Sequence, residues 1–152
     1  MKTVQILFVV LAQAAIISTQ AQDQNDLMLA KYHKIYSEKI GEDREIYISV
    51  PEKYEKSGKK YPVLYMMDRE FNATPGLIGS IRYLEFLSQT PEFIVVGIKN
   101  TNRDKDIYPV EVTYRDGTKA GGRAVQYLSF ISDELIPFIN KTYRTEDLRI
   151  FR

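Results

Sequence analysis

The sequence contains no cysteine and only one histidine, and both scarcities narrow its chemistry. Without cysteine there is no disulfide, no thiolate metal site, no lipid anchor on a cysteine and no cysteine nucleophile. The single histidine, His33, has no partner at H-x-x-x-H or H-E-x-x-H spacing. It falls in a strand-like segment, so we interpret it as a structural residue rather than a catalytic base or metal ligand. We expect neither a metal nor a cofactor.

An excess of charge of either sign is also missing. Lys and Arg number 21 against 20 Asp and Glu, and no basic run occurs. This balance lacks the electrostatic footprint of a nucleic-acid-binding protein, so no nucleic-acid partner is expected. Hydrophobic residues make up 44% of the 152 residues, which is enough for one globular domain with a core.

One apolar run stands out at the N-terminus. "TVQILFVVLAQAAIIS" follows Met1-Lys2 and leads to the small residue Ala21. This pattern predicts a secretory signal peptide over residues 1–21, cleaved after Ala21, and therefore a secreted or periplasmic protein without stable membrane association after cleavage. The alternative is an uncleaved membrane anchor, although the run is short for a span of about 20 residues. Residues 22–31 read as a flexible leader and residues 32–152 as the folded domain.

The first part of the domain predicts an antiparallel hairpin. Apolar and polar residues alternate in Tyr32–Ile40 and again in Arg44–Val50, with a turn at residues 41–43. Val63–Met67 and Phe93–Ile98 are continuous apolar runs, which is typical of strands covered on both faces. Between them, Pro75-Gly76 begins a helix. Its apolar stripe consists of Leu77, Ile81, Leu84 and Leu87.

The strand–helix–strand order predicts a βαβ unit and hence an α/β fold with parallel strands. Lys99–Gly122 follows as a long polar loop, of a length that is usually functional or disordered. A second helix is predicted from Arg123 to Tyr143, with a kink at Pro137. "LRIF" after it reads as a third parallel strand. The buried face of the second helix is expected to contain Ala124, Leu128, Ile131, Leu135, Phe138 and Ile139.

No nucleophile motif is present in the sequence. None of its serines lies in G-x-S-x-G, and the nearest match, Gly79-Ser80, is placed mid-helix with Arg82 where the second glycine belongs. A nucleophile needs a sharp strand-to-helix turn to stand clear of the backbone. Tyr108 and Tyr114 lie in the long loop and are candidate substrate-binding residues, available to stack on an aromatic ring or a sugar.

Four stretches carry a resemblance to a known family: "KKYPVLYMMDREFN", "EFIVVGIKNTNRDKDIYP", "GGRAVQYLSFISDELIPFINKTYRT" and "LRIFR". In order and spacing they resemble the putative-esterase family of α/β-hydrolases, which includes enterochelin-esterase-like, feruloyl-esterase-like and esterase D-like proteins. The likeness runs from about Tyr32 to Arg152. It implies the N-terminal portion of an α/β-hydrolase sheet, in which an antiparallel hairpin precedes the parallel strands.

The resemblance also implies a site. In the family, the strand after "YRT" runs into G-H-S-x-G-G, and the acid and the histidine follow later. The sequence ends before that turn, so no catalytic triad residue is expected in it. By position, the backbone N–H of Glu70 would donate to the oxyanion, although Arg69 replaces the usual glycine.

The resulting expectation is the N-terminal portion of an exported serine carboxylester hydrolase, catalytically incomplete as given. Its substrate would be a small-molecule or polysaccharide-linked ester. The alternative is a secreted non-catalytic module that binds a glycan or a siderophore through Lys99–Gly122. A third possibility is a fragment without function, prone to aggregate through its last strand.

Overall fold

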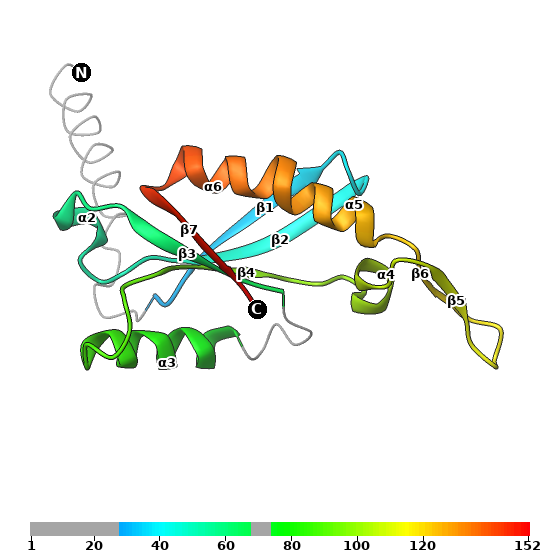
Figure 1. Cartoon of the computed structure of the whole chain (residues 1–152), viewed down its shortest axis with the longest axis horizontal. Coiled ribbons are helices and arrows are strands. Elements are labelled where there is room, and N and C mark those ends of the chain that lie inside the picture. Colours follow the sequence, from blue (N-terminus) through cyan, green and yellow to red (C-terminus); the bar gives the residue numbers. More distant parts are fainter. Residues whose placement is uncertain (1–27, 68–73) are drawn as a thin grey trace, which may run out of the picture.

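A five-stranded mixed sheet forms the centre of the structure, a computed structural model that describes residues 28–67 and 74–152 (Figure 1). The strand order is β1-β2-β4-β3-β7. The predicted signal peptide and most of the leader lie outside the described residues. Within the described part of the chain, no helix has the length and hydropathy of a membrane span. The five strands are β1 Lys31–Ser37, β2 Glu42–Ser49, β3 Tyr61–Met66, β4 Ile94–Ile98 and β7 Thr145–Phe151.

The predicted hairpin is present as β1 and β2, which pair antiparallel with Ser37 opposite Glu42. The turn comes earlier in the chain than predicted, because Glu38–Gly41 form it and Glu42 belongs to β2. Gly41 has a φ of 76°, a left-handed conformation that glycine adopts without steric cost. Its N–H donates to the Ser37 carbonyl over 2.8 Å, which closes the turn.

Two parallel pairings complete the sheet around β3. Val63 to Met66 pair with Ile94 to Gly97 of β4, and β7 runs parallel to β3 on its other side. Strands buried on both faces have apolar side chains on both, and the sequences YPVLYM and IVVGI meet that requirement. The βαβ prediction and the third parallel strand are therefore confirmed.

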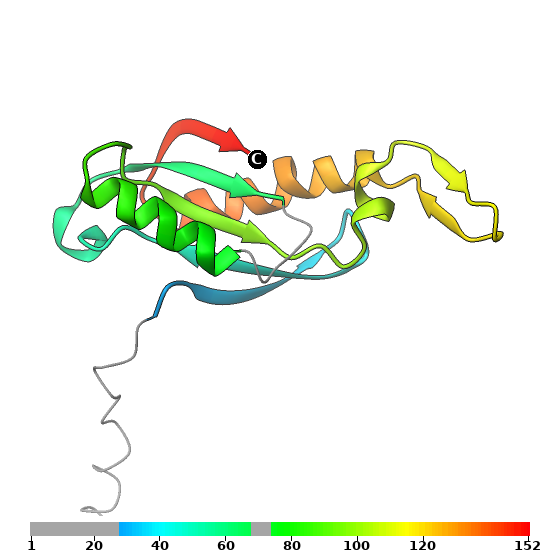
Figure 2. The ribbon, with the colours of Figure 1, turned by 90° about the horizontal axis from the view of Figure 1, so that it is seen from below.

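Helices cover both faces of the sheet (Figures 1 and 2). Helix α3, Thr74–Phe86, covers one face, where Ile78 and Ile81 join a cluster with Met66 and Val95. On the other face lies a long helix of three consecutive parts, α5 Ala124–Ser129, η2 Phe130–Leu135 and α6 Ile136–Thr142. A short helix, α2 Tyr54–Ser57, precedes β3.

The long helix widens before Pro137, where a kink was predicted. Segment η2 is π-helical, and the Ile136 N–H donates to the Ile131 carbonyl. The long helix buries Tyr127, Phe130, Ile131, Leu135 and Ile139, and all of these except Phe130 recur every four positions. Four residues exceed an α-helical turn of 3.6, so this repeat would drift round an α-helix, and the wider π turns correct the drift. The predicted face is wrong at Leu128, which is 62% exposed.

Helix α3 departs from its prediction at its C-terminal end. Ile81 is buried as predicted, whereas Leu84 and Leu87 are exposed. The N-terminal half of the helix packs on the sheet through Ile78 and Ile81. The apolar stripe is therefore longer than the sheet surface that covers it in the described part of the chain.

The segment Lys99–Gly122 is not a plain loop. It contains helix α4, Arg103–Ile107, and a separate two-stranded sheet of β5, Glu111–Thr113, and β6, Lys119–Gly121. The Asp116 carboxylate accepts from both the N–H and the hydroxyl of Thr118, which fixes the hairpin turn beside Gly117. In Figure 1 this hairpin extends beyond the carboxyl end of β4.

Candidate active site

The carboxyl ends of β3 and β7 lie side by side at one edge of the sheet. The Met67 N–H donates to the Arg152 carbonyl over 2.9 Å, and the Arg152 N–H donates to the Tyr65 carbonyl over 2.9 Å. β4 ends at the same edge because it is parallel to β3. In open α/β sheets, ligands bind outside the carboxyl ends of the strands, which makes this edge the candidate active site.

An aromatic stack fixes the end of β7. The rings of Tyr65 and Phe151 are stacked, with centroids 5.1 Å apart and planes at 13°. Burial raises the pKa of Tyr65 to about 12, and the neighbouring Arg149 opposes that rise. Tyr65 therefore stays a neutral phenol at ordinary pH and serves as packing beneath the strand end.

A buried ion pair anchors the segment that follows β4. The Arg44 guanidinium on β2 donates to both Asp106 carboxylate oxygens on α4, over 2.7 and 3.0 Å, and both side chains are buried. Glu42 lies 2.7 Å from the same guanidinium, and the Tyr127 ring lies 5.6 Å from its central carbon. Bidentate pairing of this kind fixes orientation as well as distance, so α4 is held in one position on the sheet.

Tyr108 and Tyr114 both lie in the segment Lys99–Gly122, as the sequence indicates, and their exposed fractions are 39% and 43%. The Tyr108 carbonyl accepts from the Gly122 N–H over 2.9 Å, while Tyr114 stands at the hairpin turn and accepts from Gly117. Local desolvation, followed by the charges of Asp104, Tyr108 and Asp116, raises the pKa of Tyr114. The structure thus brings both tyrosines into one exposed segment next to the carboxyl end of β4.

His33 lies on β1, which is the outer strand on the other side of the sheet from β7. Its Nε2 is 3.2 Å from the Tyr143 hydroxyl, and its ring makes an edge contact with Phe138. Burial, followed by the nearby charge of Lys31, lowers the pKa of His33. These contacts are those of a packed strand residue.

Ser80 is placed inside α3, as its sequence context indicates. Its hydroxyl donates to the Gly76 carbonyl over 2.9 Å, a local helix contact. Glu70, the candidate oxyanion donor, lies outside the described residues. Across residues 28–67 and 74–152, no group of three or more His, Asp or Glu side chains is arranged to hold a metal ion.

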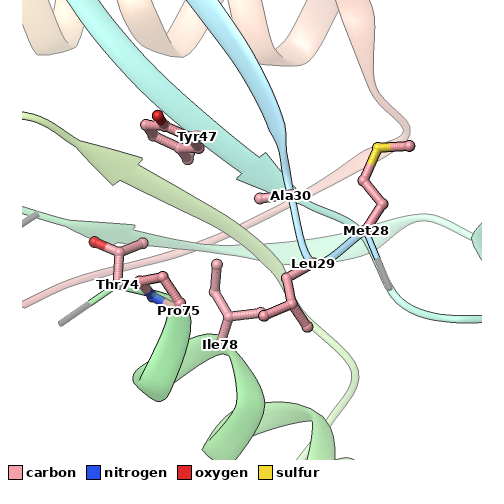
Figure 3. A pocket seen from close by; sticks show the side chains of 7 residues that line it. All are labelled: Met28, Leu29, Ala30, Tyr47, Thr74, Pro75 and Ile78. Atoms are coloured by element: carbon pink, nitrogen blue, oxygen red, sulfur yellow. The ribbon is translucent and has the colours of Figure 1, made fainter. Parts of the chain in front are cut away.

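An apolar pocket of about 300 Å³ lies between the first two strands and α3 (Figure 3). Leu29, Ala30 and Tyr47 line it from the strand side, and Thr74, Pro75 and Ile78 line it from the first turns of the helix. These mostly apolar side chains suit the binding of an apolar group and contain no acid, base or strong nucleophile.

Sequence reasoning missed the Arg44–Asp106 pair, which joins residues 62 positions apart. The available signal was that Asp106 lies in "EFIVVGIKNTNRDKDIYP", one of the four stretches that resemble the esterase family. Its partner on β2 carried no signal, because an arginine in a half-exposed strand normally points to solvent.

The fold and the strand-end site define an α/β-hydrolase-like protein, and comparisons with known proteins agree. The family model described as "Putative esterase" matches residues 37–150. An IroE-like serine hydrolase from Shewanella oneidensis shares 33% identity at a TM-score of 0.65, over 80% of this chain and 41% of that one. A search of curated proteins found no match.

Two further solved structures show the fold. The BES protein from Bacillus cereus has 21% identity and a TM-score of 0.70, over 86% of this chain and 55% of that chain. The enterobactin esterase FES from Shigella flexneri has 17% identity and a TM-score of 0.60, over 82% of this chain and 29% of that chain.

The chain belongs to this esterase family, because the family model matches more than half of it. It spans 41% of the length of the Shewanella hydrolase and 55% of the Bacillus protein. Its described residues correspond to a hydrolase sheet up to and including β7.

Proposed function

We propose that this chain forms the N-terminal portion of an exported serine carboxylester hydrolase. The observation that carries the proposal is the parallel pairing of β3 and β7, closed by the hydrogen bonds of Met67 and Arg152. It brings the carboxyl ends of the two strands together. In the family, the residues that follow these ends are the oxyanion loop after β3 and the nucleophile turn after β7.

The reaction would proceed through an acyl-enzyme. A serine in the turn after β7 would attack the ester carbonyl, and backbone N–H groups would hold the resulting oxyanion. Water would then hydrolyse the acyl-enzyme. No serine of the 152-residue sequence lies in G-x-S-x-G, so the proposed chemistry would need residues that follow Arg152.

The first test compares two lengths of protein. We expect the reading frame after Arg152 to encode G-x-S-x-G, and the longer product to hydrolyse p-nitrophenyl acetate and to be labelled by a serine-directed phosphonate. The 152-residue chain should show neither. Labelling of the 152-residue chain, or an unrelated sequence after Arg152, contradicts the proposal.

The second test concerns the oxyanion donor, which we assign to the Glu70 N–H. In the longer product, Glu70→Pro removes this N–H and should lower kcat by about 10²- to 10³-fold. Glu70→Ala keeps the N–H and is the matched control. Equal activity of the two variants would reject Glu70 as the donor.

Tyr108 and Tyr114 are proposed to contact the substrate, whose ester group would be part of a small molecule or linked to a polysaccharide. Replacing both with Ala should raise KM while leaving kcat near its original value, because they lie outside the reacting centre. Tyr83→Ala, at an exposed tyrosine on α3, is the control. An unchanged KM for aromatic and sugar esters removes the assignment.

Export is proposed from the N-terminal sequence. N-terminal sequencing of the exported protein should give Gln22 as its first residue. Retention in the membrane with Met1 intact favours the anchor instead.

A further inference from the structure

A polar hollow of about 540 Å³ lies between α4, the β5–β6 hairpin and the start of α5. Its lining includes Asn102, Lys105, Lys119, Arg123 and Gln126. Unlike the apolar pocket of Figure 3, it is surrounded by hydrogen-bond donors. It lies in the segment that follows the carboxyl end of β4, where α/β proteins bind their ligands.

The charge in this hollow is mostly positive. Its single carboxylate, Glu111, is already paired with the Lys119 ammonium, 2.6 Å away. Within the described residues, the Lys105 ammonium has no hydrogen bond or ion pair. Arg123 is 3.8 Å from Glu42 and donates weakly to the Ile40 carbonyl over 3.5 Å. A guanidinium has five N–H donors, so most of them are left for a ligand.

The backbone holds Lys105 and Arg123 next to each other. The Arg123 N–H donates to the Lys105 carbonyl over 3.2 Å, and the Asn102 side chain accepts from the Lys105 N–H over 3.1 Å. Lys105 directly precedes Asp106, whose buried pairing with Arg44 fixes α4 to the sheet. The backbones of the two positive residues are therefore fixed relative to each other, which lowers the entropic cost of binding an anion between their side chains.

We propose that this hollow is an anion subsite that binds a carboxylate-bearing small molecule between Lys105 and Arg123. The planar guanidinium matches a carboxylate through two parallel hydrogen bonds, and the ammonium adds a compact charge. The side-chain amide of Gln126 adds a further donor to the lining. Resting on the proposed function, this inference narrows the substrate to an ester whose acyl or alcohol part carries a carboxylate.

The test measures binding without turnover, on the full product of the reading frame. Isothermal titration calorimetry with citrate should show saturable binding, whereas trimethyl citrate, its neutral counterpart, should not bind. Lys105→Gln and Arg123→Gln should each weaken citrate binding about tenfold, as expected for a lost hydrogen bond to a charged group. Lys60→Gln removes an exposed lysine before β3 and should leave binding unchanged.

Three results overturn the subsite. These are an equal loss in Lys60→Gln, binding of trimethyl citrate as tight as that of citrate, and binding of inorganic phosphate as tight as that of citrate at equal ionic strength. If Arg123→Gln fails to fold, Lys105→Gln decides, because its ammonium has no partner in the described structure. Citrate binding by a longer product that lacks esterase activity contradicts only the proposed function, and esterase activity without citrate binding contradicts only the subsite.

Discussion

Gly97 on β4 faces Thr74, the first residue of α3. A Cβ at this position would be 2.9 Å from the Thr74 Cγ2, a distance that packed carbon atoms do not tolerate. Gly97→Ala should therefore lower the free energy of unfolding by about 1–3 kcal/mol through overpacking. Urea denaturation measures the effect.

Two variants make this prediction specific. Gly79 lies in α3 with nothing within 4 Å of its Cβ position, so Gly79→Ala should stabilise by about 0.5–1 kcal/mol through helix propensity. Thr74→Ser removes the methyl group that Gly97→Ala would strike, so the double variant should regain most of the lost stability. A Gly97→Ala protein as stable as the original contradicts the close contact.

Tyr65 gives a prediction in alkaline solution. Burial raises its pKa from 10.0 to about 12, so the unfolded chain releases this proton first as pH rises. The contribution of Tyr65 to stability is complete below about pH 10 and is lost as pH rises towards 12. Tyr65→Phe should lose less stability between pH 9 and pH 11, measured by urea midpoints. Identical losses in the two proteins would contradict the shift.

At the scale of elements, the buried Arg44–Asp106 pair anchors α4 to the sheet. Asp106→Ala leaves the buried Arg44 guanidinium without its bidentate partner and should cost about 3–5 kcal/mol. Lys119→Ala breaks an exposed pair on the hairpin and should cost at most about 1 kcal/mol. Hydrogen exchange should show lost protection in α4 for the first variant alone. Equal protection in both would show that α4 is held by other contacts.

Elements with a long, repeated pattern could be predicted from the sequence. The alternation in Arg44–Val50 and the apolar runs of β3 and β4 define strands because burial on one or two faces leaves a distinct residue pattern. The β5–β6 hairpin was missed because strands of three residues are too short to show alternation. Its Asp116-Gly117 pair is a hairpin signal that was available.

The long helix shows a different limit. Its existence and its residues Ile131, Leu135 and Ile139 could be predicted, whereas the π-helical segment η2 could not. A π turn occurs where the buried side chains are spaced more widely along the chain than the 3.6 residues of an α-helical turn. The four-residue spacing that favours it includes Tyr127, whereas the sequence pattern predicted Leu128 on the buried face, and only packing on the sheet distinguishes the two.

For the candidate site, topology was predictable and side-chain partners were not. The order of strands and the family motifs indicated which ends meet, since parallel strands share an edge. The Arg44–Asp106 pair joins residues 62 positions apart, and the hollow around Lys105 and Arg123 forms only when the hairpin folds next to α4 and α5. Only the folded arrangement brings these groups together.

At the scale of the whole molecule, the outer strand β7 exposes apolar side chains. β7 forms one edge, and its Leu148, Ile150 and Phe151 are exposed within the described part of the chain. An exposed apolar edge favours pairing with another strand. The 152-residue chain should therefore self-associate, and Ile150→Lys should reduce light scattering at high concentration. Glu146→Lys, which removes no apolar surface from the same strand, should not.

The order β1-β2-β4-β3-β7 also has a consequence during synthesis on the ribosome. The strand Tyr61–Met66 leaves the tunnel early, yet one of its two flanking strands ends only at Phe151. Since translation adds about 5–20 residues per second, β3 keeps one side open for several seconds while the nascent chain grows. The β3–β7 side of this sheet is thus the part that is completed last.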